Sequence, residues 1–145
     1  MHEPPATLTR RHLLLLALPA ACSRDDPQAA LEATVQRLQD ALEARDSAAV
    51  LALLDRGSVV QGEPGREWAR RTMALVFLRY PNVRVVAPVR RSTVDPTAPH
   101  LGLTEAQVLL VGAQGLLPER VEPYAVRLRW QREDGQWRLL GLEWS

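Results

Sequence analysis

Apolar residues recur at helical spacing in the first half of the chain. Between residues 27 and 46 they follow steps of four, three and four, from Leu31 to Leu42, which predicts an amphipathic helix of about five turns. Asp46 is placed to cap a second, shorter helix that continues to residue 54. A third predicted helix covers residues 66–80, and its apolar surface is broader than one stripe, which is typical of a well-buried helix.

After residue 81 the apolar period changes to two, which predicts strands. The predicted strands cover residues 83–90, 104–112, 124–131 and 137–144. Asp134-Gly135 separates the last two and is a strong signal for a hairpin turn. Gly57 and the cluster at residues 61–65 predict a loop between the second and third helices. Three helices followed by a four-stranded antiparallel meander make an α+β fold.

The order of these elements and two local segments together resemble a known protein family. The first segment is Ala44-Arg45-Asp46, between a long and a short helix, and the second is the closing hairpin at residues 128–140. They resemble the nuclear transport factor 2-like (SnoaL-like, cystatin-type α+β roll) superfamily over most of residues 28–145. The resemblance implies N-terminal helices packed in the concave face of a curved four-stranded antiparallel sheet. The resulting cone often has a ligand pocket at its open end.

The superfamily does not by itself assign a function. Its members include ketosteroid isomerase, polyketide cyclases, epoxide hydrolases and many non-catalytic modules, so function has to be argued from the residues of a site. Convex-sheet dimerisation is also common among them.

Residues 1–21 have the composition of an export signal peptide. Arg10 and Arg11 precede an apolar run at residues 13–18, which is far shorter than the ~20 residues of a transmembrane helix. The segment from Thr9 to Leu14 (TRRHLL) resembles the twin-arginine export motif. General-secretion signals also carry paired arginines, so both export routes stay open.

Cys22 ends a segment, Leu18-Pro19-Ala20-Ala21-Cys22, that resembles a bacterial lipobox, except that Pro19 stands where Leu is usual. It is the only cysteine of the chain. We expect it to carry the lipid, and the alternative is a free thiol in a secreted protein. Residues 22–28 would then be the lipidated cysteine and a short tether, and residues 29–145 the folded domain. Ser23 favours outer-membrane over inner-membrane delivery, which predicts a cell-envelope protein on the periplasmic side.

Charge and composition exclude several classes of function. The 18 basic residues, all of them Arg, nearly balance the 17 acidic ones, and a net charge of +1 argues against nucleic-acid binding. The absence of Lys removes Schiff-base and P-loop lysine chemistry. After residue 21 the chain has one His and one Cys, which cannot form a His- or Cys-rich metal site. We therefore expect no metal and no cofactor.

Two carboxylates are weak candidates for a catalytic base. A two-residue turn at Asp134-Gly135 pairs Leu128 with Gly141 and Val126 with Glu143. Glu143 would then lie on the concave face, where it is either the polar anchor of a pocket or a structural partner of an Arg. The second candidate, Asp95, lies in a turn next to Pro96.

The same register predicts the residues of each sheet face. The candidate pocket residues are Trp68, Tyr80, Tyr124, Trp130 and Glu143, although aromatic residues of a small domain belong to the core more often than to a ligand site. The opposite face would hold a homodimer patch of Arg127, Arg129, Arg138, Leu140, Leu142 and Trp144. The alternative to a homodimer is that the tether or residues 113–121 cover this patch.

These observations predict a non-enzymatic, lipid-anchored protein whose roll binds a small apolar ligand or a protein partner. One alternative is a small isomerase- or cyclase-type enzyme that uses Glu143 or Asp95 as its base. The other is a structural assembly factor that acts through the sheet face.

Overall fold

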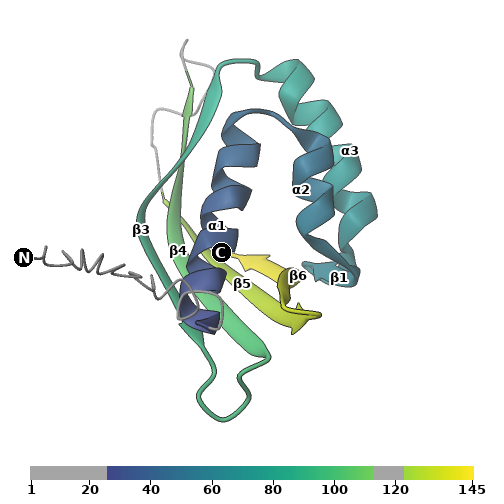
Figure 1. Cartoon of the computed structure of the whole chain (residues 1–145). Helices are drawn as coiled ribbons and strands as arrows, with labels where there is room; N and C mark the ends of the chain where they lie inside the picture. The colour runs from purple at the N-terminus through teal and green to yellow at the C-terminus, as the bar shows by residue number, and fades with distance from the viewer. Residues whose placement is uncertain (1–25, 113–122) are drawn as a thin grey trace, which may run out of the picture.

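The computed structural model describes residues 26–112 and 123–145, which form three helices and six strands. The elements are α1 (Pro27–Glu43), α2 (Ser47–Leu53), β1 (Leu54–Val60), β2 (Glu63–Pro64), α3 (Gly65–Arg79), β3 (Val83–Val94), β4 (Leu101–Gly112), β5 (Tyr124–Glu133) and β6 (Gln136–Trp144). Helix α1 lies along the inside of the curved sheet formed by β3, β4 and β5, while α2 and α3 lie together near β1 (Figure 1). The predicted α+β class and the helices inside a curved, open sheet are confirmed.

The sheet has six strands in the order β2-β1-β6-β5-β4-β3, so the prediction of a four-stranded sheet is wrong. All neighbours are antiparallel except β1 and β6, which are parallel. The two missed strands, β1 and β2, occupy residues that the Gly-rich pattern assigned to a loop. Their partner β6 lies at the far end of the chain, and such a long-range pairing leaves no local periodicity to detect.

The segment predicted as a loop contains a tight hairpin turn instead. Gln61 and Gly62 join β1 to β2 with φ of 48° and 83°, the positive values that a two-residue hairpin turn needs. Within β1, the Asp55 carboxylate accepts a hydrogen bond from the Gly57 amide at 2.8 Å, which interrupts the regular alternation of the strand. The expected turn at Asp134-Gly135 is present, with φ of 50° and 75°.

The helix cap predicted at Asp46 is observed, and Asp26 caps α1 in the same way. The Asp26 carboxylate accepts hydrogen bonds from the amides of Gln28 (3.0 Å) and Ala29 (3.2 Å), and Asp46 accepts one from the Ala49 amide (3.0 Å). Pro27 occupies the first position of α1, where its missing N–H costs nothing. Each helix therefore begins within a residue or two of the position that the sequence predicts.

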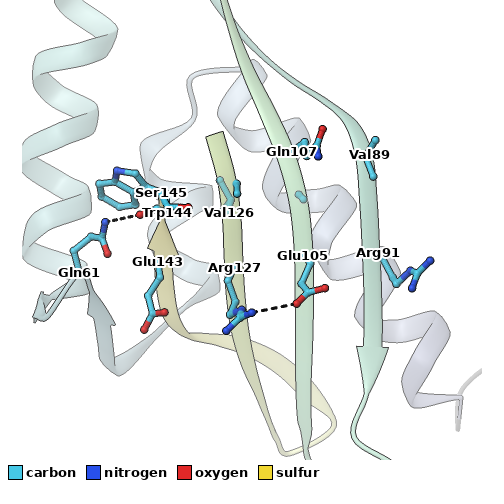
Figure 2. Close-up of a pocket in the computed structure, with 12 residues that line it drawn as sticks. Gln61, Val89, Arg91, Glu105, Gln107, Val126, Arg127, Glu143, Trp144 and Ser145 are labelled. Carbon is cyan, nitrogen blue, oxygen red and sulfur yellow. Dashed lines mark hydrogen bonds and ion pairs between the residues drawn. The ribbon is translucent and has the colours of Figure 1, made fainter. Parts of the chain in front are cut away.

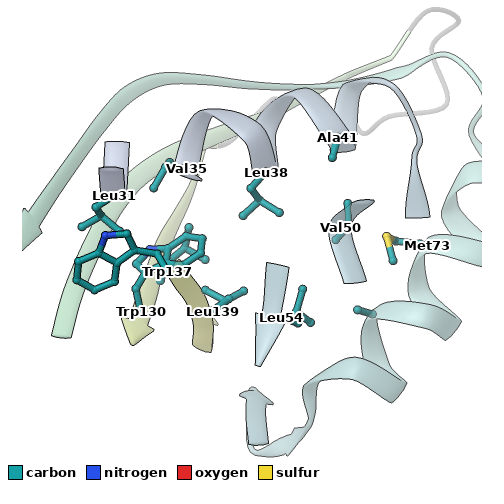
Figure 3. Packing of buried hydrophobic residues seen from close by; sticks show 12 residues of the cluster. Leu31, Val35, Leu38, Ala41, Val50, Leu54, Met73, Trp130, Trp137 and Leu139 are labelled. Atoms are coloured by element: carbon teal, nitrogen blue, oxygen red, sulfur yellow. The ribbon is translucent and has the colours of Figure 1, made fainter. Parts of the chain in front are cut away.

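The hydrophobic core lies between α1 and the concave face of the sheet (Figure 3). Leu31, Trp130 and Trp137 are 0%, 1% and 2% exposed, respectively. The Trp137 indole donates a hydrogen bond to the Pro27 carbonyl at 3.1 Å, which fixes the start of α1 to β6. Gly102 allows Leu31 to approach the backbone of β4, because a Cβ at this position would lie 2.8 Å from the Leu31 Cδ2 atom. This end of the roll is therefore filled with side chains.

Replacing Leu31 by Ala should lower the free energy of unfolding by about 2–5 kcal/mol, because it removes a fully buried side chain and leaves a cavity. Leu78→Ala is the matched control, since Leu78 is 85% exposed on α3 and should change stability by less than about 0.5 kcal/mol. Urea unfolding followed by circular dichroism measures both. Equal effects of the two substitutions would contradict the packing of α1 described above.

Candidate functional site

A largely apolar cavity of about 490 Å³ lies between the helices and the concave face of the sheet. Its apolar lining comes from all three helices and from β1, β3, β4, β5 and β6. These residues are Val35, Leu38, Leu42, Val50, Leu54, Val60, Trp68, Ala69, Met73, Val85, Ala87, Ala106, Val108, Leu110, Val126, Leu128, Leu139, Leu142 and Trp144. The polar lining residues are Gln39, Thr72, Arg90, Thr104 and Tyr124. Among the described lining residues there is no carboxylate, imidazole or thiol.

Two tryptophans form part of the cavity wall. Trp68 of α3 and Trp144 of β6 have ring centroids 5.4 Å apart and an interplanar angle of 42°. Both rings are half-buried and line the cavity. This pair joins α3 to the end of β6, so the wall depends on the last strand of the chain.

The buried polar residue of the lining, Thr104, is already hydrogen-bonded. Thr104 is fully buried, and its hydroxyl shares a 2.8 Å hydrogen bond with Ser92 and accepts one of 3.0 Å from the Trp130 indole. Trp130 is therefore a core residue and is not among the lining residues, in contrast to its place in the predicted pocket set. A ligand would find few free polar groups here.

Of the remaining predicted pocket residues, Tyr124 lines the cavity and is 45% exposed. Tyr80 does not line it, because it follows the last turn of α3, where its carbonyl accepts a hydrogen bond from Arg45 at 3.2 Å. Of the pocket residues expected from the sequence, the structure thus brings Trp68 and Tyr124 to one cavity.

The predicted register of β5 and β6 is correct near the turn and wrong beyond it. Trp130 pairs with Leu139 as expected, but Leu128 pairs with Leu142 and Val126 with Trp144. A bulge between these pairs inserts one residue into β6, and one extra residue exchanges the faces of every following side chain. Leu142 and Trp144 consequently line the cavity, so the expectation that both point to the convex face is wrong. Trp144 also lines the edge of the hollow on the convex side.

The bulge also moves Glu143 away from the cavity. Glu143 pairs with Arg127 on the convex face, so the expectation of a concave carboxylate beside Val126 is wrong. Glu143, Arg127, Glu105 and Arg91 stand directly opposite one another on four neighbouring strands. They line a shallow hollow of about 680 Å³ (Figure 2), in which Arg127 and Glu105 form an ion pair at 3.4 Å. Both side chains of this pair are more than half exposed, so water screens it.

The other members of the expected convex patch are arranged differently. The guanidinium of Arg129 lies against Gly141, where a Cβ would come within 2.6 Å of its Nη2 atom. Arg138 donates hydrogen bonds to the Ala52 carbonyl and, at 3.3 Å, to Gln136. Leu140 is half-buried within the bulge. These side chains do not form one apolar surface with Leu142 and Trp144.

Asp95 is engaged in a turn and does not line the cavity. Its carboxylate accepts hydrogen bonds from the hydroxyl and amide of Thr97, at 2.8 and 2.9 Å, and from the Ala98 amide at 3.3 Å. These bonds, led by the one from the Thr97 hydroxyl, hold the pKa of Asp95 below its ordinary value of 3.8. A catalytic base that works near neutral pH has its pKa raised, so both the direction of this shift and the position disfavour Asp95.

Arg90 is the charged residue at the cavity wall that sequence reasoning missed. It projects from the concave side of β3 and donates hydrogen bonds to the side-chain carbonyls of Gln39 (2.7 Å) and Gln36 (2.9 Å) on α1. A bulge between Val86 and Val89 changes the alternation of β3, so a strict two-residue period does not assign Arg90 to its correct face.

Several expectations concern residues outside the described ranges. Cys22, Arg10, Arg11 and residues 113–121 belong to this group, and the lipidation and export predictions stay predictions. Within the described ranges, no group of acidic, His or Cys residues could hold a metal ion. None of the three described helices combines the length and apolar composition of a membrane span.

Solved structures of other proteins share this arrangement, although no protein-family model and no curated protein matches the sequence. A nuclear transport factor 2-like protein of unknown function from Pseudomonas putida aligns with a TM-score of 0.65 at 13% identity, over 81% of this chain and 84% of that one. Hexachlorocyclohexane dehydrochlorinase LinA-type3 from Novosphingobium barchaimii aligns with a TM-score of 0.62 at 16% identity, over 81% of this chain and 84% of that one.

Bdellovibrio bacteriovorus Bd1075 aligns with a TM-score of 0.65 at 13% identity over 79% of this chain, which spans only 38% of the length of that protein. At such identities the likeness is one of fold. The chain thus has the nuclear transport factor 2-like, cystatin-like fold that the order of its elements predicted.

Proposed function

We propose, from the premise that this chain has the nuclear transport factor 2-like fold, that its concave cavity binds a small apolar molecule without transforming it. The observation that carries the proposal is the composition of the wall, where apolar side chains surround about 490 Å³ and five of the described lining residues are polar. Small-molecule sites typically have volumes of roughly 300–1,000 Å³ and are lined mainly by apolar and aromatic groups. Trp68 and Trp144 supply the aromatic part of this wall.

The wall also favours binding over catalysis. Proton transfer in an isomerase- or cyclase-type reaction needs a group that can take up a proton near neutral pH, most often His, Asp or Glu. The described lining contains none of these, and the two candidate carboxylates, Glu143 and Asp95, lie elsewhere. The enzymatic alternative would have to use another group, such as the phenol of Tyr124, or a base outside the described lining.

Filling the cavity should block binding. We expect N-phenyl-1-naphthylamine, a neutral apolar dye, to bind the purified chain at one saturable site with increased emission. Ala106→Trp should weaken this binding at least about tenfold, because Ala106 lies on the concave side of β4 between Thr104 and Val108. Fluorescence titration measures the dissociation constant.

Ala125→Trp is the matched control for this experiment. Ala125 is exposed and lies on the convex side of the neighbouring strand β5, so the same added bulk should leave the dissociation constant within about twofold of wild type. The proposal fails if the wild-type chain shows no saturable dye binding. It also fails if both tryptophan variants lose binding equally.

We further propose that the protein is held at the periplasmic side of the outer membrane by a lipid on Cys22, after export by the twin-arginine or the general secretion route. The sequence around Cys22 supports this, since small residues precede the only cysteine of the chain. A thioether-linked lipid and an acylated amine together provide the two or more chains that stable anchoring needs.

Cys22→Ala should abolish incorporation of a radiolabelled fatty acid, because the thiol is the acylated group, and should leave the precursor uncleaved or the domain unanchored. Ser23→Ala should keep both the label and the membrane fractionation. Metabolic labelling followed by fractionation measures both properties. Unchanged labelling of Cys22→Ala would exclude the lipid anchor.

A second candidate function, assembly through the convex face, is favoured by one observation. The row Arg91, Glu105, Arg127 and Glu143 alternates in charge across four strands. A two-fold axis through the middle of such a row places Glu105 opposite Arg127 of a second copy, and Arg91 opposite Glu143. The row is therefore complementary to itself, as the interface of a symmetric dimer must be.

Glu105→Arg should weaken self-association at least about tenfold, because it places like charges opposite each other across the axis. The double substitution Glu105→Arg with Arg127→Glu restores opposite charges and should recover the dimer. Arg70→Glu, on the exposed face of α3, is the control and should have no effect. Sedimentation equilibrium at micromolar concentration and low salt measures association. A monomeric wild-type chain would remove this candidate.

A further inference from the structure

We infer that the ligand of the concave cavity is an amphiphile with an apolar body and a single anionic head group, and that the head group binds to Arg90. The inference rests on the proposed function and adds to it the chemical class of the ligand. It follows from the position of Arg90, from the partners that its guanidinium has, and from the composition of the rest of the wall.

Arg90 lies at the boundary between the cavity and solvent. Its register partner on β4 is Ala106, whose side chain contributes to the concave wall, and its own side chain is exposed as well as lining the cavity. Gln36 and Gln39 hold it from α1, which packs against β3. A ligand whose body enters the cavity could therefore keep its head group beside Arg90 and in contact with water.

The guanidinium is fixed in position without being neutralised. Both of its described hydrogen bonds end on neutral amide oxygens, at 2.7 and 2.9 Å. The three ion pairs in the described part of the chain are Glu67–Arg70, Glu63–Arg71 and Glu105–Arg127, and none includes Arg90. The carboxylate of Asp40 accepts a hydrogen bond from the amide nitrogen of Gln36 at 2.8 Å, so it stabilises this glutamine. A guanidinium has more N–H donors than these two bonds use, and it matches carboxylate and phosphate groups well.

The described residues of the remaining wall offer no second charge that could compete for the head group. Besides Arg90, their polar groups are an amide, two hydroxyls of threonine and a phenol, and Thr104 is already bonded to Ser92 and Trp130. A cationic head group would meet a like charge at Arg90, and a neutral hydrocarbon would leave this arginine without an anion. An anionic amphiphile satisfies both the apolar wall and the guanidinium.

The test compares three probes with the same twelve-carbon body and different head groups. These are dodecanoate and dodecyltrimethylammonium, each below its micelle concentration, and dodecanol, below its solubility limit, all competing with N-phenyl-1-naphthylamine for the full, unacylated chain. We expect dodecanoate to bind at least about tenfold more tightly than dodecanol, which is a modest gain for a hydrogen bond to a charged group. The ammonium should bind more weakly than the alcohol. Shortening the acid by one methylene should weaken binding about fourfold.

Variants then locate the head group. Arg90→Gln should remove the preference for acid over alcohol and leave the affinity for dodecanol within about threefold. Arg90→Lys keeps the charge and should keep part of the preference. Arg91→Gln is the matched control, because Arg91 is the next residue on β3 and points to the convex face, where it lines the other hollow. It should leave the preference unchanged. Circular dichroism confirms folding of each variant.

The outcomes separate the ligand class from the proposed function. Equal binding of acid and alcohol by the wild-type chain overturns the anionic head group and leaves apolar binding in place. A preference for the acid that survives in Arg90→Gln overturns the assignment of the head group to Arg90. Tighter binding of the ammonium also overturns the anionic head group. If neither the dye nor any probe binds, the proposed function itself fails. The wild-type comparison decides the ligand class even if Arg90→Gln does not fold.

Discussion

The bulge in β6 sets the character of both faces of the sheet. It places Leu140 and Gly141 where regular pairing with β5 would have one residue, and every later side chain of the strand changes face. Gly141 makes room for the guanidinium of Arg129, because any Cβ there would collide with it. As a result Leu142 and Trp144 complete an apolar wall, while Glu143 joins a row of charges on the convex side. A regular strand would have reversed these roles.

The cavity exists because the helices are attached to opposite parts of the sheet. Helix α1 is fixed to β3 by its amide side chains, since Gln28 donates to the Ser92 carbonyl at 2.7 Å and accepts from the Val94 amide at 3.0 Å. Helix α3 follows β1 and β2, so it stands at the other end of the strand order and meets β6 through Trp68 and Trp144. The Leu31 end of the roll is filled, and the space between α1, α3 and the β3–β4 strands remains open to a ligand.

The described part of this wall has few polar groups, which supports the proposal of a binding site. Thr104 is hydrogen-bonded to Ser92 and Trp130, and these bonds offset the desolvation cost of its buried hydroxyl. The potential bases are outside, Asp95 in a turn that stabilises its ionised form and Glu143 on the convex face. Many chemistries occur on this fold, and the wall of each cavity decides between them. Arg90 is the charged group among the described residues of this wall.

The sequence by itself determined the parts of the molecule that depend on neighbouring residues. The helix caps at Asp26 and Asp46, the periods of the helices and of the four long strands, and the turn at Asp134-Gly135 are all local, and the structure contains each of them. Their order was sufficient for the α+β class, and the resemblance that rests on this order implied the roll. The pairing of Trp130 with Leu139 was also predictable, because it is set by the adjacent turn.

The tertiary structure decided what depends on distant pairing. Strand β1 is stabilised by its pairing with β6, which lies at the far end of the chain. Gly57 interrupts the apolar alternation of β1, so a local pattern does not identify the strand. The bulges in β3 and β6 shift Arg90, Glu143 and Trp144 relative to a strict two-residue period. Because side chains alternate between faces, one inserted residue reverses the assignment of all that follow. The residues of the cavity wall and of the charged row could therefore be assigned only from the observed pairing of the strands.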